Sequence, residues 1–197
     1  FVPGMKPKPP TEVHRQQLWR CLLEGVRRVD PVVAESMAER PQQLERASWT
    51  WGFYGQYRDI NIDLPGIEAL LRQRAPTPED RGVSVDHFVT LGSPLGNRVI
   101  QRGLKGRHEV GLQRYPDNIR RWTNVVAVGE LTALDRHMAN DFGEMLELGL
   151  VEQIDDLDVY NHYRENGRLH VHSEYGYLVN ATTGRLVADW WRTHAMS

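Results

Sequence analysis

Apolar residues recur along the chain at helical spacing in some segments and at strand spacing in others. Residues 11–29 carry four apolar positions at helical spacing: Leu18, Cys21, Leu22 and Val26. Thr11 is a suitable N-cap for this helix, and Pro31 stands in the first turn of a second predicted helix over residues 31–39. Three more helices are predicted, over residues 64–74, 132–148 and 184–194.

Strands are predicted between these helices, over residues 48–57, 85–91, 124–128 and 169–171. Residues 85–91 are mostly apolar on both faces, as buried parallel strands require. The Asp-Asp-Leu-Asp run at residues 155–158 is typical of a solvated acidic loop. Strands that alternate with helices predict an α/β fold with a mostly parallel sheet flanked by helices, in a single domain over residues 1–197.

Composition narrows the class of protein. The chain of 197 residues has one cysteine and a formal net charge of −2, and 40% of it is hydrophobic. A single cysteine excludes an internal disulfide framework and multi-cysteine zinc modules. Since no apolar run approaches the roughly eighteen residues of a membrane span, we expect a cytoplasmic globular protein without a membrane span.

The charge is unevenly distributed. Residues 81–123 carry eight basic and three acidic residues, whereas residues 124–197 carry five basic and twelve acidic ones. The basic stretch from Arg98 to Arg121 could meet phosphates, but it lacks the interleaved aromatic residues on which bases stack. A solvated face that pairs with the acidic C-terminal third is favoured over a nucleic-acid partner.

Ionisable side chains that could act in catalysis follow two of the predicted strands. Glu130 comes just after strand 124–128, and His172 comes just after strand 169–171. Ligands and catalytic groups of open α/β sheets lie at the carboxyl ends of the strands. An acid followed by a histidine matches the second and third members of a Ser–acid–His set, so the Glu130 carboxylate and the His172 ring should meet at about 3 Å.

Other roles for these residues remain open. Glu130 could instead be a loop carboxylate that stabilises the following helix through its dipole, with Asp135 as the competing acid. His172 could be an ordinary hydrogen-bonded loop histidine. His170 and His172 could form a zinc or manganese site with the acidic run at residues 155–158.

Three stretches together resemble the C-terminal half of bacterial α/β-hydrolase-fold lipase/esterase-like proteins. They are Phe-Val-Thr-Leu-Gly-Ser-Pro-Leu at 88–95, Trp-Thr-Asn-Val at 122–125 followed by Gly129-Glu130, and His172 followed by Tyr-Gly-Tyr-Leu at 175–178. The opening Phe-Val-Pro-Gly-Met resembles the first core strand of that family and its oxyanion-hole turn. The resemblance implies a serine hydrolase acting on a small ester or acyl substrate without a cofactor. It makes Glu130 the orienting acid and His172 the base, while the backbone of Gly4 and Met5 would form the oxyanion hole.

The nucleophile elbow Gly-x-Ser-x-Gly of that family is absent from the sequence. The nearest match surrounds Ser84 but precedes a predicted strand, whereas an elbow follows one. Ser93 lies in a turn where the family has a serine that is not the nucleophile. We therefore expect an omitted segment near residues 78–86, and residues before Phe1, which looks like part of a strand. The alternative is a catalytically inactive hydrolase-fold protein that acts as a binding or scaffold module.

Overall fold

The computed structural model describes residues 11–44, 84–102, 104, 106–130 and 137–195. The helices of these residues are α1 (Thr11–Arg27), α2 (Pro31–Ala38), α5 (Arg98–Gln101), α6 (Met138–Asp141), α7 (Glu144–Glu147), α8 (Glu174–Leu178) and α9 (Ala181–Ala195). The strands are β1 (Val85–Leu91), β2 (Ile119–Ala127), β3 (Gln153–Val159), β4 (Arg164–Glu165) and β5 (Arg168–Leu169). Short 3₁₀ turns cover Pro41–Gln43, Pro94–Gly96 and Gly111–Gln113.

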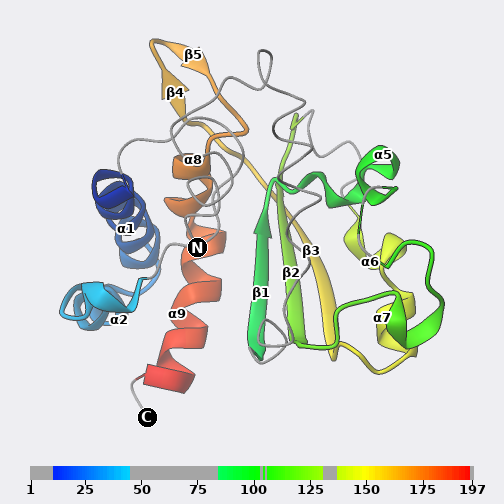
Figure 1. The fold of residues 1–197 in the computed structure, drawn as a ribbon. Coiled ribbons are helices and arrows are strands. Elements are labelled where there is room, and N and C mark those ends of the chain that lie inside the picture. Colours follow the sequence, from blue (N-terminus) through cyan, green and yellow to red (C-terminus); the bar gives the residue numbers. More distant parts are fainter. Residues whose placement is uncertain (1–10, 45–83, 103, 105, 131–136, 196–197) are drawn as a thin grey trace.

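Strands β1, β2 and β3 form a parallel sheet in that order, and β4 and β5 form a separate antiparallel hairpin. Helices α5, α6 and α7 lie on one side of the sheet, and the other four helices lie on the opposite side (Figure 1). This arrangement confirms the α/β class and the parallel sheet flanked by helices. All three strands end at the same edge of the sheet, near the β4–β5 hairpin.

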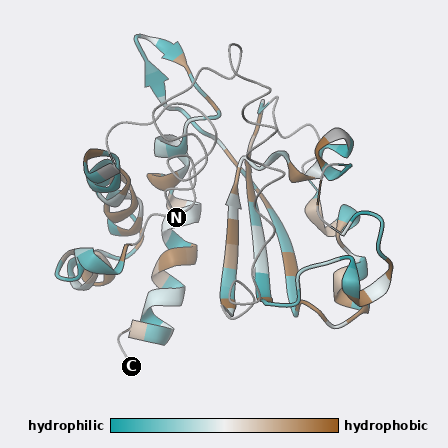
Figure 2. Ribbon diagram, viewed as in Figure 1, coloured by the Kyte–Doolittle hydropathy of each residue, from teal (hydrophilic) through white to brown (hydrophobic). Residues whose placement is uncertain are grey.

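Each face of the sheet packs against its own set of helices. Phe88, Trp122 and Ile154 belong to a cluster with Met138 of α6 and Met145 of α7. Alternate positions on the same strands belong to a second cluster on the other face, which includes Val89, Val125, Ala127, Val159, Tyr177 and Leu186. Figure 2 shows that β1 is hydrophilic at its amino end and more hydrophobic further along. On the central strand β2, burial begins at Trp122 and continues to Ala127.

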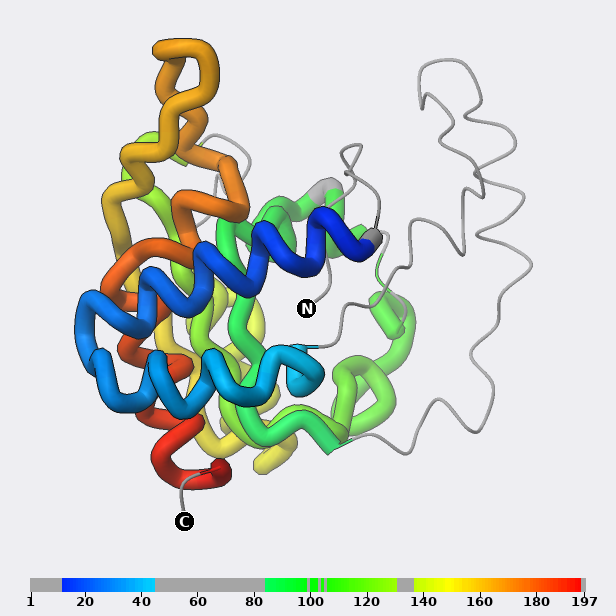
Figure 3. Tube along the Cα trace, turned by 90° about the vertical axis from the view of Figure 1, so that its left-hand side faces the viewer, coloured from blue at the N-terminus to red at the C-terminus, as the bar shows by residue number. Residues whose placement is uncertain are grey.

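Helices α1, α2 and α9 form a third cluster beside the sheet, and α1 and α2 lie side by side (Figure 3). The Asp30 carboxylate caps α2 by accepting a hydrogen bond from the Val33 amide at 3.0 Å. Helices α1 and α9 meet at glycines: a Cβ atom on Gly184 would lie 2.1 Å from the carbonyl oxygen of Gly25. This close approach fixes where α9 crosses α1.

Most of the predicted elements that fall on described residues are confirmed. Helices α1, α2 and α9 and strands β1 and β2 lie where the hydrophobic pattern places them, with β1 at the predicted bounds and β2 beginning five residues earlier than expected. The predicted helix over 132–148 is wrong in its described part, which forms the two short helices α6 and α7. The predicted strand over 169–171 ends at Leu169, in the hairpin. The elements predicted over 48–57 and 64–74 lie outside the described residues.

The acidic run at 155–158 is not a loop but the middle of β3. Aspartate is depleted in strands, so three aspartates in four residues favour a loop on propensity alone. Asp156 is tolerated there because its carboxylate accepts hydrogen bonds from the Asn124 side chain and from the Met138 and Ala139 amides, at 2.9–3.0 Å. The carboxylate thus joins β3 to β2 and caps α6.

Candidate active site

Glu130 lies in the turn that follows β2. The strand ends at Ala127, and Gly129 adopts a left-handed φ of 86°, a conformation that glycine takes without strain. The Glu130 amide closes the turn by donating to the Ala127 carbonyl at 3.0 Å. Within this turn the Glu130 side chain is only 2% exposed. The acid is therefore buried at the carboxyl edge of the sheet.

His172 lies between the β4–β5 hairpin and α8. Asn166 and Gly167 turn the hairpin with φ values of 50° and 78°, and asparagine followed by glycine is the favoured pair for such tight turns. After the hairpin, the Ser173 amide donates to the His170 carbonyl at 3.0 Å. The turn leaves the His172 side chain 40% exposed, immediately before α8.

The two side chains meet, with Nδ1 of His172 2.9 Å from Oε2 of Glu130. This confirms the predicted geometry: the acid and the histidine lie within hydrogen-bond distance although 42 residues separate them. Burial of a carboxylate costs free energy unless the group is hydrogen-bonded. The contact with His172 is therefore favoured, and it fixes the orientation of the ring. The result is a buried acid that orients a partly exposed imidazole.

Tyr177 of α8 lies beside this pair. Its hydroxyl accepts a hydrogen bond from the Ala127 amide at 2.8 Å and lies 3.5 Å from Oε2 of Glu130. Burial, together with the nearby Glu130 carboxylate, raises the pKa of Tyr177 well above its ordinary value. A Cβ atom on Gly92, just after β1, would come within 2.8 Å of the same hydroxyl. Sequence reasoning assigned Tyr177 no role, and its only signal was its place in the Tyr-Gly-Tyr-Leu segment.

The hydroxyl groups of Ser36 and Ser93 accept hydrogen bonds. Ser84 directly precedes β1, so the near match to an elbow does not follow a strand. The Ser93 hydroxyl accepts from the Leu95 amide at 3.3 Å, which caps the 3₁₀ turn after β1. Ser36 accepts from the Trp191 ring at 3.2 Å. These contacts support structural roles for Ser36 and Ser93.

Several residues of the sequence prediction lie outside the described part of the chain. They are Gly4 and Met5, expected to form the oxyanion hole, Asp135, the competing acid, and residues 78–83 of the expected omission. Their predicted roles stay predictions.

His170 takes no part in the contact with Glu130. Its Nε2 lies 3.8 Å from Oε2 of Glu165, at the surface of the hairpin. Within the described ranges, no group of three or more histidine, cysteine, aspartate or glutamate side chains is arranged to hold a metal ion. Since Asp156 caps α6 across the sheet, the acidic run does not gather around the two histidines.

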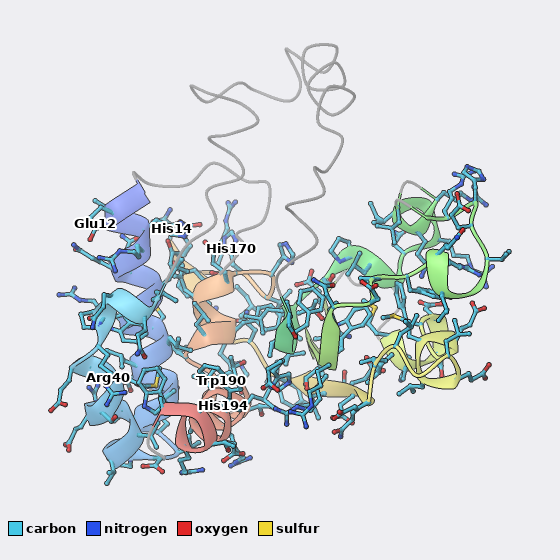
Figure 4. The ribbon with its side chains drawn as sticks, turned by 60° about the horizontal axis from the view of Figure 1, so that its bottom comes forward. Glu12, His14, Arg40, His170, Trp190 and His194 are labelled. Carbon is cyan, nitrogen blue, oxygen red and sulfur yellow. The ribbon has the colours of Figure 1, made fainter. Side chains whose placement is uncertain are left out.

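A hollow lies at the opposite, amino end of the strands, between the sheet and α9. It measures about 400 Å³, and its lining includes His87, Arg121, Asp155, Trp190 and His194. Figure 4 shows Trp190 and His194 on the same helix, and their rings stack at 4.8 Å. Burial, together with the Arg121 charge, lowers the pKa of His87. The hollow is thus distant in the fold from the Glu130–His172 pair.

Polar groups of this hollow pair with one another and with their surroundings. Asp86 receives hydrogen bonds from Arg120, Arg121 and Trp190, each at 3.0 Å. Arg120 also binds Glu152 at 3.0 Å. The Arg120–Glu152 contact and the Arg114–Glu144 contact at 3.3 Å confirm that part of the basic stretch pairs with the acidic C-terminal third. We take the Glu130–His172 pair as the candidate site because it combines a buried acid with a partly exposed imidazole.

Comparison with protein-family models, curated proteins and solved structures found no match to the chain. Among the described helices, none combines the length and apolarity that crossing a bilayer requires.

Proposed function

We propose that the chain is a serine hydrolase of the esterase or lipase type that cleaves a small ester or acyl substrate. The observation that carries this proposal is the 2.9 Å contact between Nδ1 of His172 and the buried Glu130 carboxylate. Serine hydrolases use a carboxylate in this way, because it holds the imidazole in the tautomer that accepts a proton at Nε2. The exposure of the ring supports the same role, since the base must reach a nucleophile and a substrate.

The proposed reaction uses His172 as its base. Nε2 of His172 accepts the proton of a serine hydroxyl while the serine oxygen bonds to the acyl carbon. The negative charge then rests on the former carbonyl oxygen, which backbone amides stabilise; the family resemblance assigns those amides to Gly4 and Met5. Collapse expels the alcohol, which takes the proton from Nε2. Water then attacks the acyl group on the serine by the same two steps, and the acid is released.

Covalent labelling tests the proposal and identifies the nucleophile. The native protein is treated with a fluorophosphonate probe, which reacts with activated serine hydroxyls, and the labelled peptide is mapped by mass spectrometry. We expect one labelled serine, loss of labelling in His172→Ala, and retained labelling in the control His170→Ala. Intact mass of the same sample, compared with 22.7 kDa for the 197-residue chain, shows whether it carries an additional segment.

The alternative function is a catalytically inactive scaffold of the same fold. The absence of Gly-x-Ser-x-Gly from the sequence favours it. A folded native protein that takes up no probe and hydrolyses no activated ester would contradict the hydrolase proposal and support the scaffold.

A further inference from the structure

A buried asparagine lies just beyond the end of β3. Asn161 is only 3% exposed, although Tyr160 beside it is largely exposed. Its carboxamide nitrogen donates to the Val171 carbonyl at 2.8 Å and to the Ser173 carbonyl at 3.0 Å. Its carboxamide oxygen accepts from the Tyr163 amide at 3.1 Å. Both amide hydrogens and the oxygen of one side chain are therefore used.

The two carbonyls that Asn161 binds belong to the residues on either side of His172. We propose that Asn161 is a positioning residue for His172: it binds the carbonyl groups of the residues before and after the histidine, and this clamp lets the ring meet Glu130. The inference rests on the proposed function only in treating His172 as a base. The clamp itself follows from the three hydrogen bonds.

Chemistry explains why this position needs a carboxamide. Two acceptors and one donor face the side chain, and a primary amide offers two donors and one acceptor in a single plane. Aspartate has the same shape, but ionised it has no donor, so it would place negative oxygens against two carbonyls. Asn161→Asp therefore removes the clamp with little change in volume.

A glycine in α8 makes room for the clamp. A Cβ atom on Gly176 would lie 1.8 Å from the carboxamide oxygen of Asn161, far inside contact distance. Only a residue without a side chain lets α8 approach the carboxamide this closely. Gly176 and Asn161 thus form one unit.

The clamp ties the acid and the base to adjacent strands. Glu130 follows β2, and Asn161 follows β3, which pairs with β2 through Ala127 and Val159 at their carboxyl ends. The separation of Glu130 from the backbone of His172 is therefore set by the spacing of neighbouring strands. The β4–β5 hairpin and the loop that carries His172 are in this way held rigidly to the sheet. Such rigidity matters because a misplacement of about 1 Å costs on the order of 10²-fold in rate.

The test combines nuclear magnetic resonance with kinetics on the native protein. In the wild type, we expect slow exchange of the Asn161 side-chain amide protons and a downfield His172 Nδ1 proton. In Asn161→Asp we expect the His172 proton signal to disappear. With a short-chain activated ester, kcat should fall about 10²-fold while KM stays within about threefold, because Asn161 acts through His172.

Asn180→Asp is the matched control. The Asn180 carboxamide donates to the Tyr160 carbonyl at 3.2 Å, one residue before Asn161, but it binds neither peptide beside His172. This variant should keep both the His172 signal and kcat. If Asn161→Asp does not fold, the wild-type exchange rates decide: rapidly exchanging Asn161 amide protons would overturn the clamp.

The two proposals fail in different ways. An unchanged His172 signal in folded Asn161→Asp would overturn the positioning role, whatever happens to the rate. A lost signal in a protein whose wild type hydrolyses no ester would leave the clamp standing and overturn the hydrolase function.

Discussion

Two histidine–carboxylate pairs lie near the start of α8, and their burial is reversed. His172 and Glu130 meet at 2.9 Å, with the histidine 40% exposed and the acid 2% exposed. His14 of α1 and Glu174 of α8 meet at 2.8 Å, with the histidine fully buried and the acid 16% exposed. Nearly equal distances thus occur in two different environments.

The reversal separates a chemical role from a structural one. A buried acid beside an exposed ring can orient a base that still reaches a substrate. A buried ring joins two helices, and Figure 4 shows His14 on the side of α1 that faces the rest of the molecule. The ring also packs edge-on against Tyr175, with centroids 6.2 Å apart. A short histidine–carboxylate distance alone therefore does not identify an active site, and exposure of the imidazole must be considered with it.

Removal of the exposed histidine is the strongest test of the difference between the two pairs. In the native protein, His172→Ala should lower kcat/KM for a short-chain activated ester by about 10⁴-fold, because a serine hydroxyl is a weak nucleophile without its base. Thermal stability should fall less than activity, because the buried Glu130 carboxylate loses the ring but keeps its contact with the Tyr177 hydroxyl. Glu130→Gln should cost somewhat less, and His170→Ala should stay within about tenfold.

The same variants separate the hydrolase from a metal enzyme. At a metal site, His170 and His172 would be equally essential and a chelator would inhibit. Full activity of His172→Ala would remove the base assignment.

Removal of the buried histidine should have the opposite profile. His14→Ala leaves a cavity and takes the hydrogen-bond partner from Glu174, so we expect a loss of about 2–4 kcal/mol in the free energy of unfolding, measured in urea. Labelling by a fluorophosphonate should persist in the folded fraction. The control is Gln17→Ala, which removes an exposed hydrogen bond from Tyr175 and should cost less than about 1 kcal/mol. Equal stability of the wild type and His14→Ala would contradict the structural role.

Alkaline pH should weaken the helix junction around His14 by a smaller amount. Burial, together with the Glu174 carboxylate, raises the pKa of Tyr175 to about 12. In the unfolded chain a tyrosine titrates near 10, about two units lower. The contribution of the neutral phenol is therefore fully present below about pH 10 and is lost as pH rises from about 10 to 12.

Urea unfolding across this pH range measures the effect. Tyr175→Phe should show a flatter decline in stability than the wild type. Identical pH profiles would exclude Tyr175 as a source of the decline.

The sequence by itself determined that Glu130 lies in the turn after a strand of the parallel sheet. Strand β1 could be predicted because its residues are apolar on both faces, and burial between helices requires that pattern. Helices α1 and α9 could be predicted from periodicity, which reflects one packed face. The meeting of Glu130 and His172 was predicted from their order along the chain, although His172 follows the antiparallel β4–β5 hairpin and not a strand of the parallel sheet.

Only the tertiary structure decided the features that depend on partners far along the chain. Strand β3 was hidden because its aspartates disfavour a strand locally, and the Asn124 amide and the α6 backbone that satisfy Asp156 come from other elements. His14, Tyr177 and Asn161 have no local pattern that marks them. Their roles arise from burial and from hydrogen bonds across the fold, such as the bond that the Ala127 amide of β2 donates to the Tyr177 hydroxyl, 50 residues away. Local pattern thus set the elements, while long-range contacts set the environment of each side chain.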